Sequence, residues 1–361
     1  MRVLIAAGGT GGHIYPGIAV AKEIVRRHSD AEVKFVGTAR GLENKLVSEA
    51  GFGLSLIDSA GLKNVGVVTR ARGLLVLPKS LQQAQALIKH FQPDVVIGAG
   101  GYVSGPVLLT ASWLKLPTLV MESNALPGWT NRVLARFIDK AAVSFEAALP
   151  FFRGKGAITG NPVRREFFEI PEKQRDLSRL SLLIFGGSQG AHAINEAMVA
   201  ALSLLGEVKN KVRITHQTGE ADYEQVSSGY TNAGWGDQAN VRKYIDDMVA
   251  AFIPVDLVIC RAGATTTAEL IAAGKASLMI PFPFAADDHQ RKNAEAMEAA
   301  GATKMILQEN LSPQRLAKEI ETLVHEPEKV TAMEHAARKL SRGDAAAKVV
   351  DLVEGMLERR Q

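Results

Sequence analysis

Two glycine-rich segments of the same design are the strongest chemical signal in this 361-residue sequence. Each follows a short apolar run and precedes a helix-forming stretch. They are residues 8–13, Gly-Gly-Thr-Gly-Gly-His, and residues 186–191, Gly-Gly-Ser-Gln-Gly-Ala. Glycines at such positions permit a tight strand-to-helix turn and let backbone N–H groups approach an anion at the positive end of the helix. The pair predicts two Rossmann-like halves that face one diphosphate ligand.

A third segment, residues 260–270, reads Cys-Arg-Ala-Gly-Ala-Thr-Thr-Thr-Ala-Glu-Leu. We expect a strand to end near Gly263 and a helix to begin there with free N–H groups and threonine hydroxyls, which suit a nucleotide diphosphate. Glu269, one turn further on, can accept hydrogen bonds from two vicinal ribose hydroxyls. In the alternative interpretation the threonines only cap the helix and Glu269 favours its dipole. The two glycine loops favour the ligand interpretation.

Residues 287–290, Asp-Asp-His-Gln, precede another helical stretch. Gln290 offers both a donor and an acceptor, which suits neutral sugar hydroxyls better than phosphate. The aspartates alternatively cap the helix, and both roles can hold together. An NAD site is disfavoured, because the strand at 33–36 ends in Gly37-Thr38-Ala39 and lacks the acidic residue that holds a ribose there.

Apolar runs alternate with helical stretches along both halves of the chain, which is typical of a parallel sheet covered on both faces. The predicted strands are 3–7, 33–37, 95–98, 118–121 and 141–144 in the first half, and 182–185, 212–215, 257–260, 277–280 and 304–307 in the second. Gly-Asn-Pro-Val-Arg at 160–164 and the charged stretch 166–179 interrupt this rhythm. We therefore predict two α/β domains, 1–161 and 162–340, with a final helix at 341–361 that joins the first.

Composition excludes several classes of protein. The 42 basic and 38 acidic residues are intermixed and give a net charge of +4, so a general nucleic-acid surface is not indicated. The single cysteine, Cys260, excludes an internal disulfide, and no histidine pair has metal-ligand spacing, so we expect a reducing compartment and no structural zinc. Because an apolar strand is predicted from the first residues, we expect no signal peptide. The uncharged stretch 95–114 is broken by glycines and proline and does not predict a membrane span.

These segments resemble the MurG family of GT-B glycosyltransferases, the UDP-N-acetylglucosamine (UDP-GlcNAc) transferases that add the second sugar to the lipid-linked peptidoglycan precursor. The similar segments follow one another along nearly the whole chain: 8–13, 100–106 (Gly-Gly-Tyr-Val-Ser-Gly-Pro), 160–164, 186–191 and the segment around Glu269. The resemblance implies the GT-B fold, in which two Rossmann-like parallel-sheet domains face a central cleft. It implies no cofactor.

The resemblance also implies where the substrates bind. UDP-GlcNAc would lie mainly against the second domain, with the backbone of Ile245 at the uracil, Glu269 at the ribose and Gln290 at the sugar. The implied donor-site residues are Thr10, Gly11, Gly12, Asn124, Arg164, Ser188, Ile245, Ala264, Thr265, Thr266, Thr267, Ala268, Glu269 and Gln290. The lipid acceptor would meet the Thr10–His13 loop and Tyr102.

The family transfers GlcNAc to the C4 hydroxyl of undecaprenyl-diphospho-MurNAc-pentapeptide (lipid I), inverting the anomeric centre and forming lipid II. Inversion by direct attack calls for a base on the face opposite the leaving UDP. His13 is the first candidate, since its ordinary pKa is ~6.5 and a helix N-terminus favours its neutral form. Alternatively, His13 hydrogen-bonds the acceptor diphosphate. Glu122 is the second candidate, although Met121 and Ser123 depart from the family's His-Glu-Gln-Asn pattern.

The departing UDP gains charge that must be stabilised. The Asp-x-Asp pattern of metal-dependent transferases is absent, so we predict metal-independent catalysis in which the helix start at 264, Ser188 and Arg164 take that role.

A lipid acceptor requires contact with the membrane surface. A short apolar run with a basic rim predicts such a contact: Arg70, Arg72, Leu74, Leu75, Val76, Leu77, Lys79 and Leu81. Alternatively, Leu77, Leu81, Ala84 and Ile88 are core positions of one helix. We expect a peripheral enzyme on the cytoplasmic face of the bacterial inner membrane. Its expected partners are UDP-GlcNAc, lipid I, the anionic membrane surface and proteins of cell-wall synthesis and division, and no nucleic acid.

Two other functions remain open from the sequence. One is another GT-B activity, either a glycolipid glycosyltransferase or a UDP-GlcNAc 2-epimerase, which consumes the nucleotide sugar without an acceptor. The other is a non-catalytic subunit that binds a nucleotide sugar. The presence of both donor and acceptor segments argues against the non-catalytic subunit.

Overall fold

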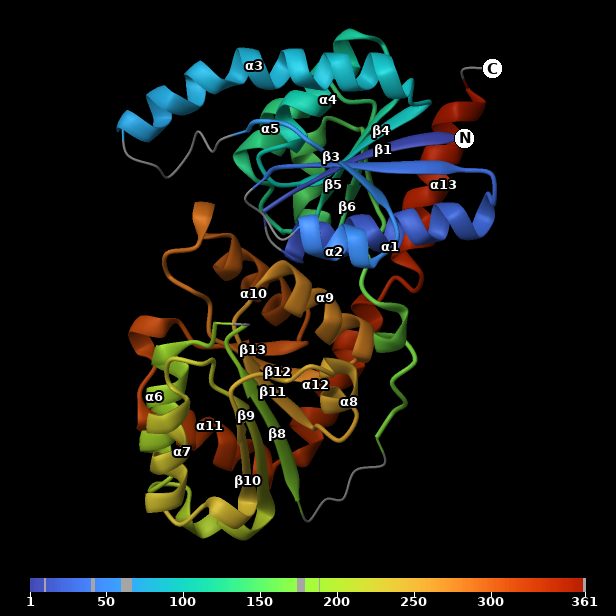
Figure 1. Ribbon diagram of the computed structural model, residues 1–361. Coiled ribbons are helices and arrows are strands. Elements are labelled where there is room, and N and C mark those ends of the chain that lie inside the picture. The colour runs from blue at the N-terminus through green and yellow to red at the C-terminus, as the bar shows by residue number, and fades with distance from the viewer. Residues whose placement is uncertain (10, 40–42, 60–66, 174–178, 188, 360–361) are drawn as a thin grey trace. The chain divides into compact units, whose positions relative to one another are not determined.

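The structure, a computed structural model, describes residues 1–9, 11–39, 43–59, 67–173, 179–187 and 189–359, with the side chains of 67–75 left outside that description. Its contacts divide the chain into two compact units. Unit 1 is Met1–Arg164 with Asp344–Gln361, and unit 2 is Arg165–Gly343. Each unit is an α/β fold with one parallel sheet, as the alternating apolar runs predict (Figure 1).

Unit 1 has seven described strands in the order β3-β2-β1-β4-β5-β6-β7. They are β1 (Arg2–Ala7), β2 (Glu32–Gly37), β3 (Gly53–Leu56), β4 (Val95–Gly100), β5 (Thr118–Glu122), β6 (Lys140–Val143) and β7 (Gly156–Ile158). The five predicted strands are all present. The two that sequence missed, β3 and β7, are the short strands at the sheet's edges and are only partly buried, so they carry no long apolar run.

Helices cover both faces of this sheet. They are α1 (Gly11–Arg27), α2 (Glu43–Glu49), α3 (Val67–Phe91), α4 (Ser104–Trp113), α5 (Trp129–Leu134) and α13 (Ala345–Glu358), with the 3₁₀ helix η1 (Glu146–Phe152). Figure 1 shows α3, α4 and α5 on one face and α1, α2 and α13 on the other. Two separate apolar clusters fill these two interfaces.

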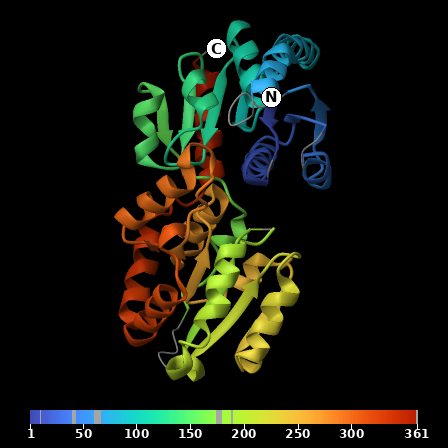
Figure 2. The ribbon, with the colours of Figure 1, turned by 90° about the vertical axis from the view of Figure 1, so that its left-hand side faces the viewer.

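The C-terminal helix α13 belongs to unit 1 although it follows unit 2 in sequence (Figures 1 and 2). Val349, Val350 and Val353 are fully buried in the cluster that also contains the apolar face of α1. At the rim, the Arg27 guanidinium of α1 donates to Asp351 at 2.6 Å and to the Ala347 carbonyl at 3.1 Å. Apolar burial therefore holds α13 against α1, and the arginine fixes its register.

Unit 2 has six described strands in the order β10-β9-β8-β11-β12-β13, also all parallel. They are β8 (Leu180–Phe185), β9 (Val212–Gln217), β10 (Ala239–Arg242), β11 (Leu257–Cys260), β12 (Ala276–Met279) and β13 (Thr303–Met305). The helices are α6 (His192–Ala201), α7 (Tyr223–Asn232), α8 (Met248–Phe252), α9 (Ala264–Ala273), α10 (His289–Ala299), α11 (Pro313–His325) and α12 (Pro327–Leu340). The 3₁₀ helices are η2 (Arg165–Phe167), η3 (Gly206–Lys211), η4 (Gly236–Gln238), η5 (Ala286–Asp288) and η6 (Gln308–Asn310).

The strand order decides where each sheet can bind a ligand. In unit 1, β1 lies between β2 and β4, and in unit 2, β8 lies between β9 and β11. The chain therefore adds strands first on one side of β1 or β8 and then on the other. Such a reversal of strand order is the switch point at which parallel α/β sheets bind ligands, at the carboxyl ends of the strands. Both glycine-rich segments begin where β1 and β8 end.

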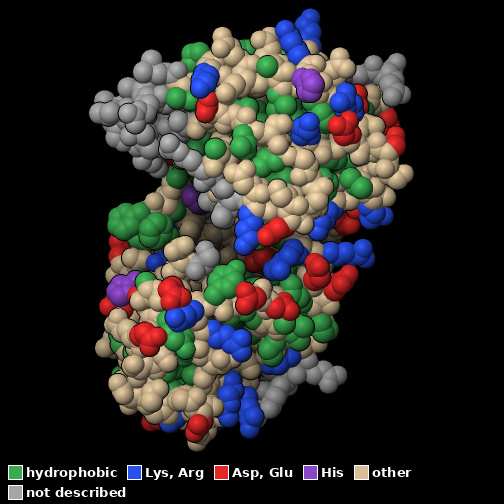
Figure 3. Space-filling view, viewed as in Figure 1, with side chains coloured by type: hydrophobic (Ala, Val, Ile, Leu, Met, Phe, Trp, Pro, Cys, Tyr) green, Lys and Arg blue, Asp and Glu red, His purple; other side chains and the backbone are tan. Residues whose placement is uncertain are grey.

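Two surface features bear on the partners of the protein. Among the described residues, no helix combines the length and apolar character that crossing a bilayer requires. On the face shown in Figure 3, Lys and Arg side chains are interspersed with Asp and Glu on both units. This distribution agrees with the intermixed charges of the sequence.

Candidate active site

In unit 1, the first glycine loop leaves β1 and enters α1, whose first turn contains Gly11, Gly12 and His13. Thr10 lies outside the described residues. The loop after β4 packs directly against Gly8 of the glycine loop. Gly101 has φ 79°, and a Cβ built there would lie 2.9 Å from the carbonyl carbon of Gly8. A side chain at position 101 would force the two loops apart, so glycine is required there.

His13 is half-buried, and its Nδ1 lies 3.2 Å from the Gly8 carbonyl oxygen. A carbonyl can only accept, so in the neutral ring Nδ1 carries the proton and Nε2 is left basic. The ring lies against Gly100, where a Cβ would be 2.9 Å from Nε2. Backbone groups thus fix the tautomer and the position of the first candidate base.

Glu43 at the start of α2 holds the same loop, and no motif in the sequence pointed to it. Its side chain is fully buried, and Oε2 accepts from the Gly9 amide at 3.2 Å. Oε1 accepts from the Thr38 amide at 2.7 Å and from the Thr38 hydroxyl at 2.9 Å. One carboxylate therefore joins the loops that follow β1 and β2.

Glu122, the second candidate base, ends β5 and is 4% exposed. Oε1 accepts from the amide and the side chain of Asn124, at 2.9 and 3.1 Å. Oε2 accepts from the Gly128 amide at 3.0 Å and from Asn131 Nδ2 at 2.9 Å. Burial raises the pKa of this carboxyl, and the four hydrogen bonds oppose that shift. This geometry is that of a group that shapes the loop carrying Asn124.

Ser123, where the sequence departs from the family pattern, makes a buried contact of its own. Its hydroxyl donates to Asn161 Oδ1 at 2.9 Å and so ties the end of β5 to the segment 160–164. Of the other predicted residues in unit 1, Asn124 is half-buried, Arg164 is exposed and Tyr102 is 57% exposed. The Tyr102 carbonyl accepts from the Ser59 hydroxyl at 2.9 Å.

In unit 2, the second glycine loop links β8 to α6, and Ser188 within it lies outside the described residues. Gly190 has φ 79°, and a Cβ there would lie 2.7 Å from the carbonyl carbon of Thr218. The loop is therefore packed against the chain that follows β9. Gln217, the last residue of β9, donates to the Gly187 carbonyl at 3.0 Å and accepts from the Ile245 amide at 2.8 Å.

The predicted diphosphate segment begins α9 as expected, with Gly263 at the N-cap in an extended conformation. Ala264, Thr265 and Thr266 are half-buried, whereas Thr267 and Ala268 are buried. The Thr267 hydroxyl turns back to the Gly263 carbonyl at 2.9 Å. Thr265 Oγ1 is buried without a hydrogen-bond partner among the described residues. Because such a hydroxyl is costly to leave unpaired, it marks a point where an acceptor atom of a ligand is expected.

Glu269 is half-buried one turn into α9, and Gln290 is half-buried in the first turn of α10. The Phe282 amide donates to Gln290 Oε1 at 3.0 Å. The side-chain nitrogen of Gln290 takes no part in this hydrogen bond. Asp288 occupies the N-cap of α10 in a left-handed conformation and makes no capping hydrogen bond through its side chain. The capping role considered for this aspartate is therefore not observed.

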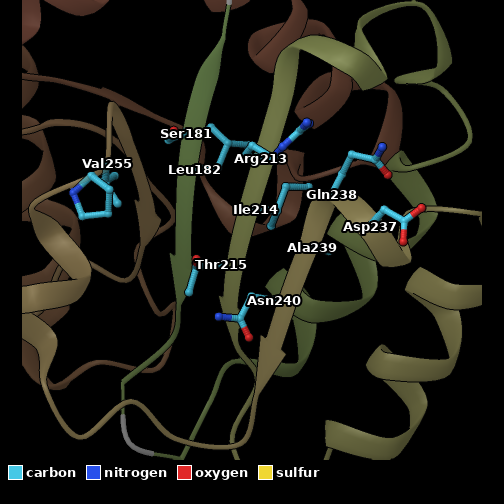
Figure 4. Close-up of a pocket in the computed structure, with 11 residues that line it drawn as sticks. Ser181, Leu182, Arg213, Ile214, Thr215, Asp237, Gln238, Ala239, Asn240 and Val255 are labelled. Atoms are coloured by element: carbon cyan, nitrogen blue, oxygen red, sulfur yellow. The ribbon is translucent and has the colours of Figure 1, made fainter. Parts of the chain in front are cut away.

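A separate hollow of about 300 Å³ lies on unit 2 at the amino ends of its strands (Figure 4). Side chains of β8, β9 and β10, including Ser181, Arg213 and Asn240, line it. None of the predicted site residues borders it. It lies at the opposite end of the sheet from the glycine loop, because those residues are near the start of each strand.

Half of the residues predicted to contact the membrane, Arg70, Arg72, Leu74 and Leu75, have side chains that lie outside the described part of the chain. Further along α3, Val76, Leu77 and Leu81 are half-buried, while Lys79 is exposed and pairs with Asp58 at 2.7 Å. Ala84 and Ile88 are buried in the core of unit 1. The alternative interpretation as a core helix therefore holds for Ala84 and Ile88, whereas Leu77 and Leu81 are only partly buried. In the part of the chain that is described, no three His, Cys, Asp or Glu side chains are grouped to hold a metal ion.

Comparisons with known proteins agree with this arrangement. The model of the glycosyltransferase family 28 N-terminal domain matches residues 3–143, and that of the C-terminal domain matches residues 181–350. The chain is 46% identical to the UDP-N-acetylglucosamine--N-acetylmuramyl-(pentapeptide) pyrophosphoryl-undecaprenol N-acetylglucosamine transferase of Anaeromyxobacter sp. (strain Fw109-5), over 100% of this chain and 94% of the relative.

Two solved structures place the fold. The crystal structure of Acinetobacter baumannii MurG matches with a TM-score of 0.81 and 32% identity, covering 98% of this chain and 99% of that one. The UDP-GlcNAc 2-epimerase of Neisseria meningitidis matches with a TM-score of 0.69 over 98% of this chain and 100% of that one. At 13% identity the second likeness concerns the fold alone.

Proposed function

Because the chain belongs to glycosyltransferase family 28, we propose that it transfers GlcNAc from UDP-GlcNAc to the C4 hydroxyl of undecaprenyl-diphospho-MurNAc-pentapeptide, forming lipid II. The observation that carries this proposal is identity of 46%, over the whole chain, to a transferase named for that reaction. The described residues of the segments that resemble the family follow the carboxyl ends of strands in the two sheets, where parallel α/β folds bind substrates.

The donor is assigned to unit 2. The half-buried start of α9 offers backbone N–H groups and the unpartnered Thr265 hydroxyl to a diphosphate. Glu269 accepts from the ribose hydroxyls and Gln290 contacts the sugar. The Ile245 amide already donates to Gln217, so its carbonyl is the group that meets the uracil. Arg164, Asn124, the Thr10–Gly12 segment and Ser188 complete the donor contacts of this proposal.

His13 is assigned as the general base. Its protonated Nδ1 is held by the Gly8 carbonyl, so Nε2 accepts the proton of the attacking C4 hydroxyl while the bond from the anomeric carbon to UDP breaks. Glu122 orients Asn124 and the loop up to Asn131, because its carboxylate oxygens accept four hydrogen bonds from that stretch. Tyr102 and the Thr10–His13 loop meet the acceptor.

Charge on the leaving diphosphate is stabilised by groups of the chain itself. The N-terminus of α9, Thr265, Ser188 and Arg164 are the proposed groups, and catalysis proceeds without a metal ion. Unit 1 is proposed to be the acceptor domain and unit 2 the donor domain, and their bounds lie within a few residues of the 1–161 with 341–361 and 162–340 expected from the sequence.

The protein is proposed to act at the cytoplasmic face of the bacterial inner membrane, where its lipid acceptor resides. Among the exposed aromatic side chains of unit 1, Trp113 is 60% and Phe137 is 43% exposed. The Ser112 hydroxyl donates to the Phe137 carbonyl at 2.8 Å, which brings the two chain segments together. Exposed Lys115 and Arg136 adjoin these aromatics in sequence. Aromatic and basic groups together suit an anionic membrane surface.

The test measures release of UDP from UDP-GlcNAc with and without a water-soluble analogue of the lipid-linked acceptor. Release that depends on the acceptor is the expected result. Release of UDP without any acceptor would favour hydrolytic or epimerase chemistry. Binding of UDP-GlcNAc without turnover would instead indicate a non-catalytic subunit.

A further inference from the structure

Gln217 of unit 2 connects two segments that meet different parts of the donor in the proposed function. The side chain is 1% exposed at the carboxyl end of β9. Its Nε2 donates to the Gly187 carbonyl in the loop after β8, at 3.0 Å. Its Oε1 accepts from the Ile245 amide, beyond β10, at 2.8 Å. A single buried amide therefore joins the loops on both sides of its own strand.

The surrounding backbone makes this arrangement close-packed. The Thr218 amide donates to the Arg242 carbonyl at 3.0 Å, and the Gly219 amide donates to the Lys243 carbonyl at 3.1 Å. On the other side, a Cβ on Gly219 would lie 2.8 Å from the Gly190 nitrogen. The chain after β9 thus separates the glycine loop from the segment leading to Ile245, and Gln217 bonds to both.

We propose that Gln217 is a positioning residue for the nucleotide of the donor, acting through the backbone of Gly187 and Ile245. The inference rests on the proposed function, because it assigns the glycine loop to the diphosphate and Ile245 to the uracil. Both ends of the amide are bonded within the protein, so its effect is to fix the spacing between the two loops. Fixing that spacing before binding lowers the cost of ordering the loops around the nucleotide.

Two substitutions separate the two hydrogen bonds. Gln217→Met has similar length and removes both. Gln217→Glu keeps an acceptor for the Ile245 amide but, when ionised, cannot donate to the Gly187 carbonyl; the protonated acid regains that donor. We expect Gln217→Met to raise the KM for UDP-GlcNAc by about tenfold while kcat at saturating donor changes less than about threefold.

Gln217→Glu provides a readout that loss of stability alone would not give. Its donor KM should be raised at neutral pH and should fall toward the wild-type value as the pH is lowered and the new carboxyl takes up its proton. The wild-type KM should show no matching fall. The ratio of the Kd for UDP to the Kd for uridine should be higher in Gln217→Met than in the wild type. Uridine engages only one of the two loops, whereas UDP engages both.

Ser277→Ala is the matched control. Ser277 is also fully buried in unit 2, and its hydroxyl donates to Thr303 Oγ1 at 2.8 Å between β12 and β13. Its position early in β12 keeps it away from the carboxyl ends of the strands. The variant loses one buried hydrogen bond and should retain the wild-type donor KM.

An unchanged donor KM in Gln217→Met would overturn the inference, as would an equal rise in Ser277→Ala. If Gln217→Met fails to fold, the Gln217→Glu variant tests the inference. A donor KM of Gln217→Glu that does not change with pH would then overturn the inference. If the wild-type protein turns over UDP-GlcNAc and Gln217→Met has the same donor KM, only the inference about Gln217 is contradicted. Wild-type protein that neither binds nor turns over UDP-GlcNAc contradicts the proposed function as well.

Discussion

The Nδ1 atom of His13 lies 3.2 Å from the carbonyl oxygen of Gly8, five residues earlier in the same loop. Because the carbonyl can only accept, this contact assigns the proton of the neutral ring to Nδ1 and leaves Nε2 as the proton acceptor. The glycine loop thus does more than turn the chain from strand to helix. It sets the chemical form of the proposed base.

His13→Ala should lower kcat by about 10² to 10⁴, the usual contribution of general base catalysis. The variant should bind UDP-GlcNAc as the wild type does, because the donor is assigned mainly to unit 2. Steady-state kinetics and donor titration by calorimetry measure the two effects. Loss of acceptor affinity with an unchanged kcat would instead favour contact between His13 and the acceptor diphosphate.

Glu43→Gln should lower kcat by about tenfold, since an amide cannot accept from both the Gly9 and Thr38 amides and loses a hydrogen bond worth about 1–2 kcal/mol. Donor affinity should stay at the wild-type value. Glu23→Gln is the matched control, because Glu23 is another buried carboxylate of unit 1 that instead pairs with Arg26 and Arg27. Equal kinetic losses in both variants would show that Glu43 contributes only stability.

Glu122→Gln separates an orienting group from a base. Substitution places an amide NH₂ among four donors, so the free energy of unfolding should fall by about 1–3 kcal/mol. Urea unfolding measures this loss. A Glu122→Gln variant with wild-type stability but no turnover would contradict the orienting role and would favour Glu122 as the base.

His216 makes the stability of unit 2 sensitive to acid. Burial lowers its pKa to about 3, and its neutral ring bonds Tyr230 through Nδ1 at 3.1 Å and Asn195 through Nε2 at 3.0 Å. Between about pH 3 and its ordinary value of 6.5 the unfolded chain binds more protons than the folded one. This group's stabilisation is therefore complete above pH 6.5 and is lost as the pH falls through that window.

The slope for this single group should approach about 1.4 kcal/mol per pH unit between the two pKa values. His216→Asn should lower the slope of the unfolding free energy against pH by about this amount, which corresponds to the uptake of one proton. Urea unfolding at a series of pH values across this range measures the slope. Because the slope counts protons, the comparison holds even if the variant is less stable throughout. An identical slope in both proteins would show that His216 is protonated in the fold.

The double variant Trp113→Asp with Phe137→Asp should weaken binding to vesicles that contain anionic lipid by about tenfold or more, because it removes two exposed aromatic side chains and adds two negative charges. Co-sedimentation measures the bound fraction. Leu204→Asp is the control, since Leu204 is 43% exposed on unit 2 and lies outside the proposed contact. Unchanged vesicle binding in the double variant would show that this surface does not contact the membrane.

Local sequence patterns predicted the parts of the fold that local patterns determine. The apolar runs gave ten of the described strands, and the glycine loops and the start of α9 lie where their turn chemistry indicates. The edge strands β3 and β7 and the short β10 escaped, because partly buried edge strands need no continuous apolar run.

The residues that support the site were harder to predict. Glu43 bonds Gly9 across 34 residues, and Gln217 bonds Gly187 across 30 and Ile245 across 28. Such pairs depend on which strands are neighbours, which periodicity within one segment does not specify. The position of Gln217, a polar residue just after the predicted strand 212–215, was the one available signal.

The chemical structure of the reaction product tests the proposed GlcNAc transfer most directly. The protein is incubated with UDP-GlcNAc and the lipid-linked muramoyl-pentapeptide, and the product is analysed by mass spectrometry and by nuclear magnetic resonance of its anomeric proton. The expected product carries one added GlcNAc, β-linked to the C4 oxygen of the muramoyl sugar. An unmodified acceptor, an α-linkage or attachment at another hydroxyl would contradict the proposed transfer.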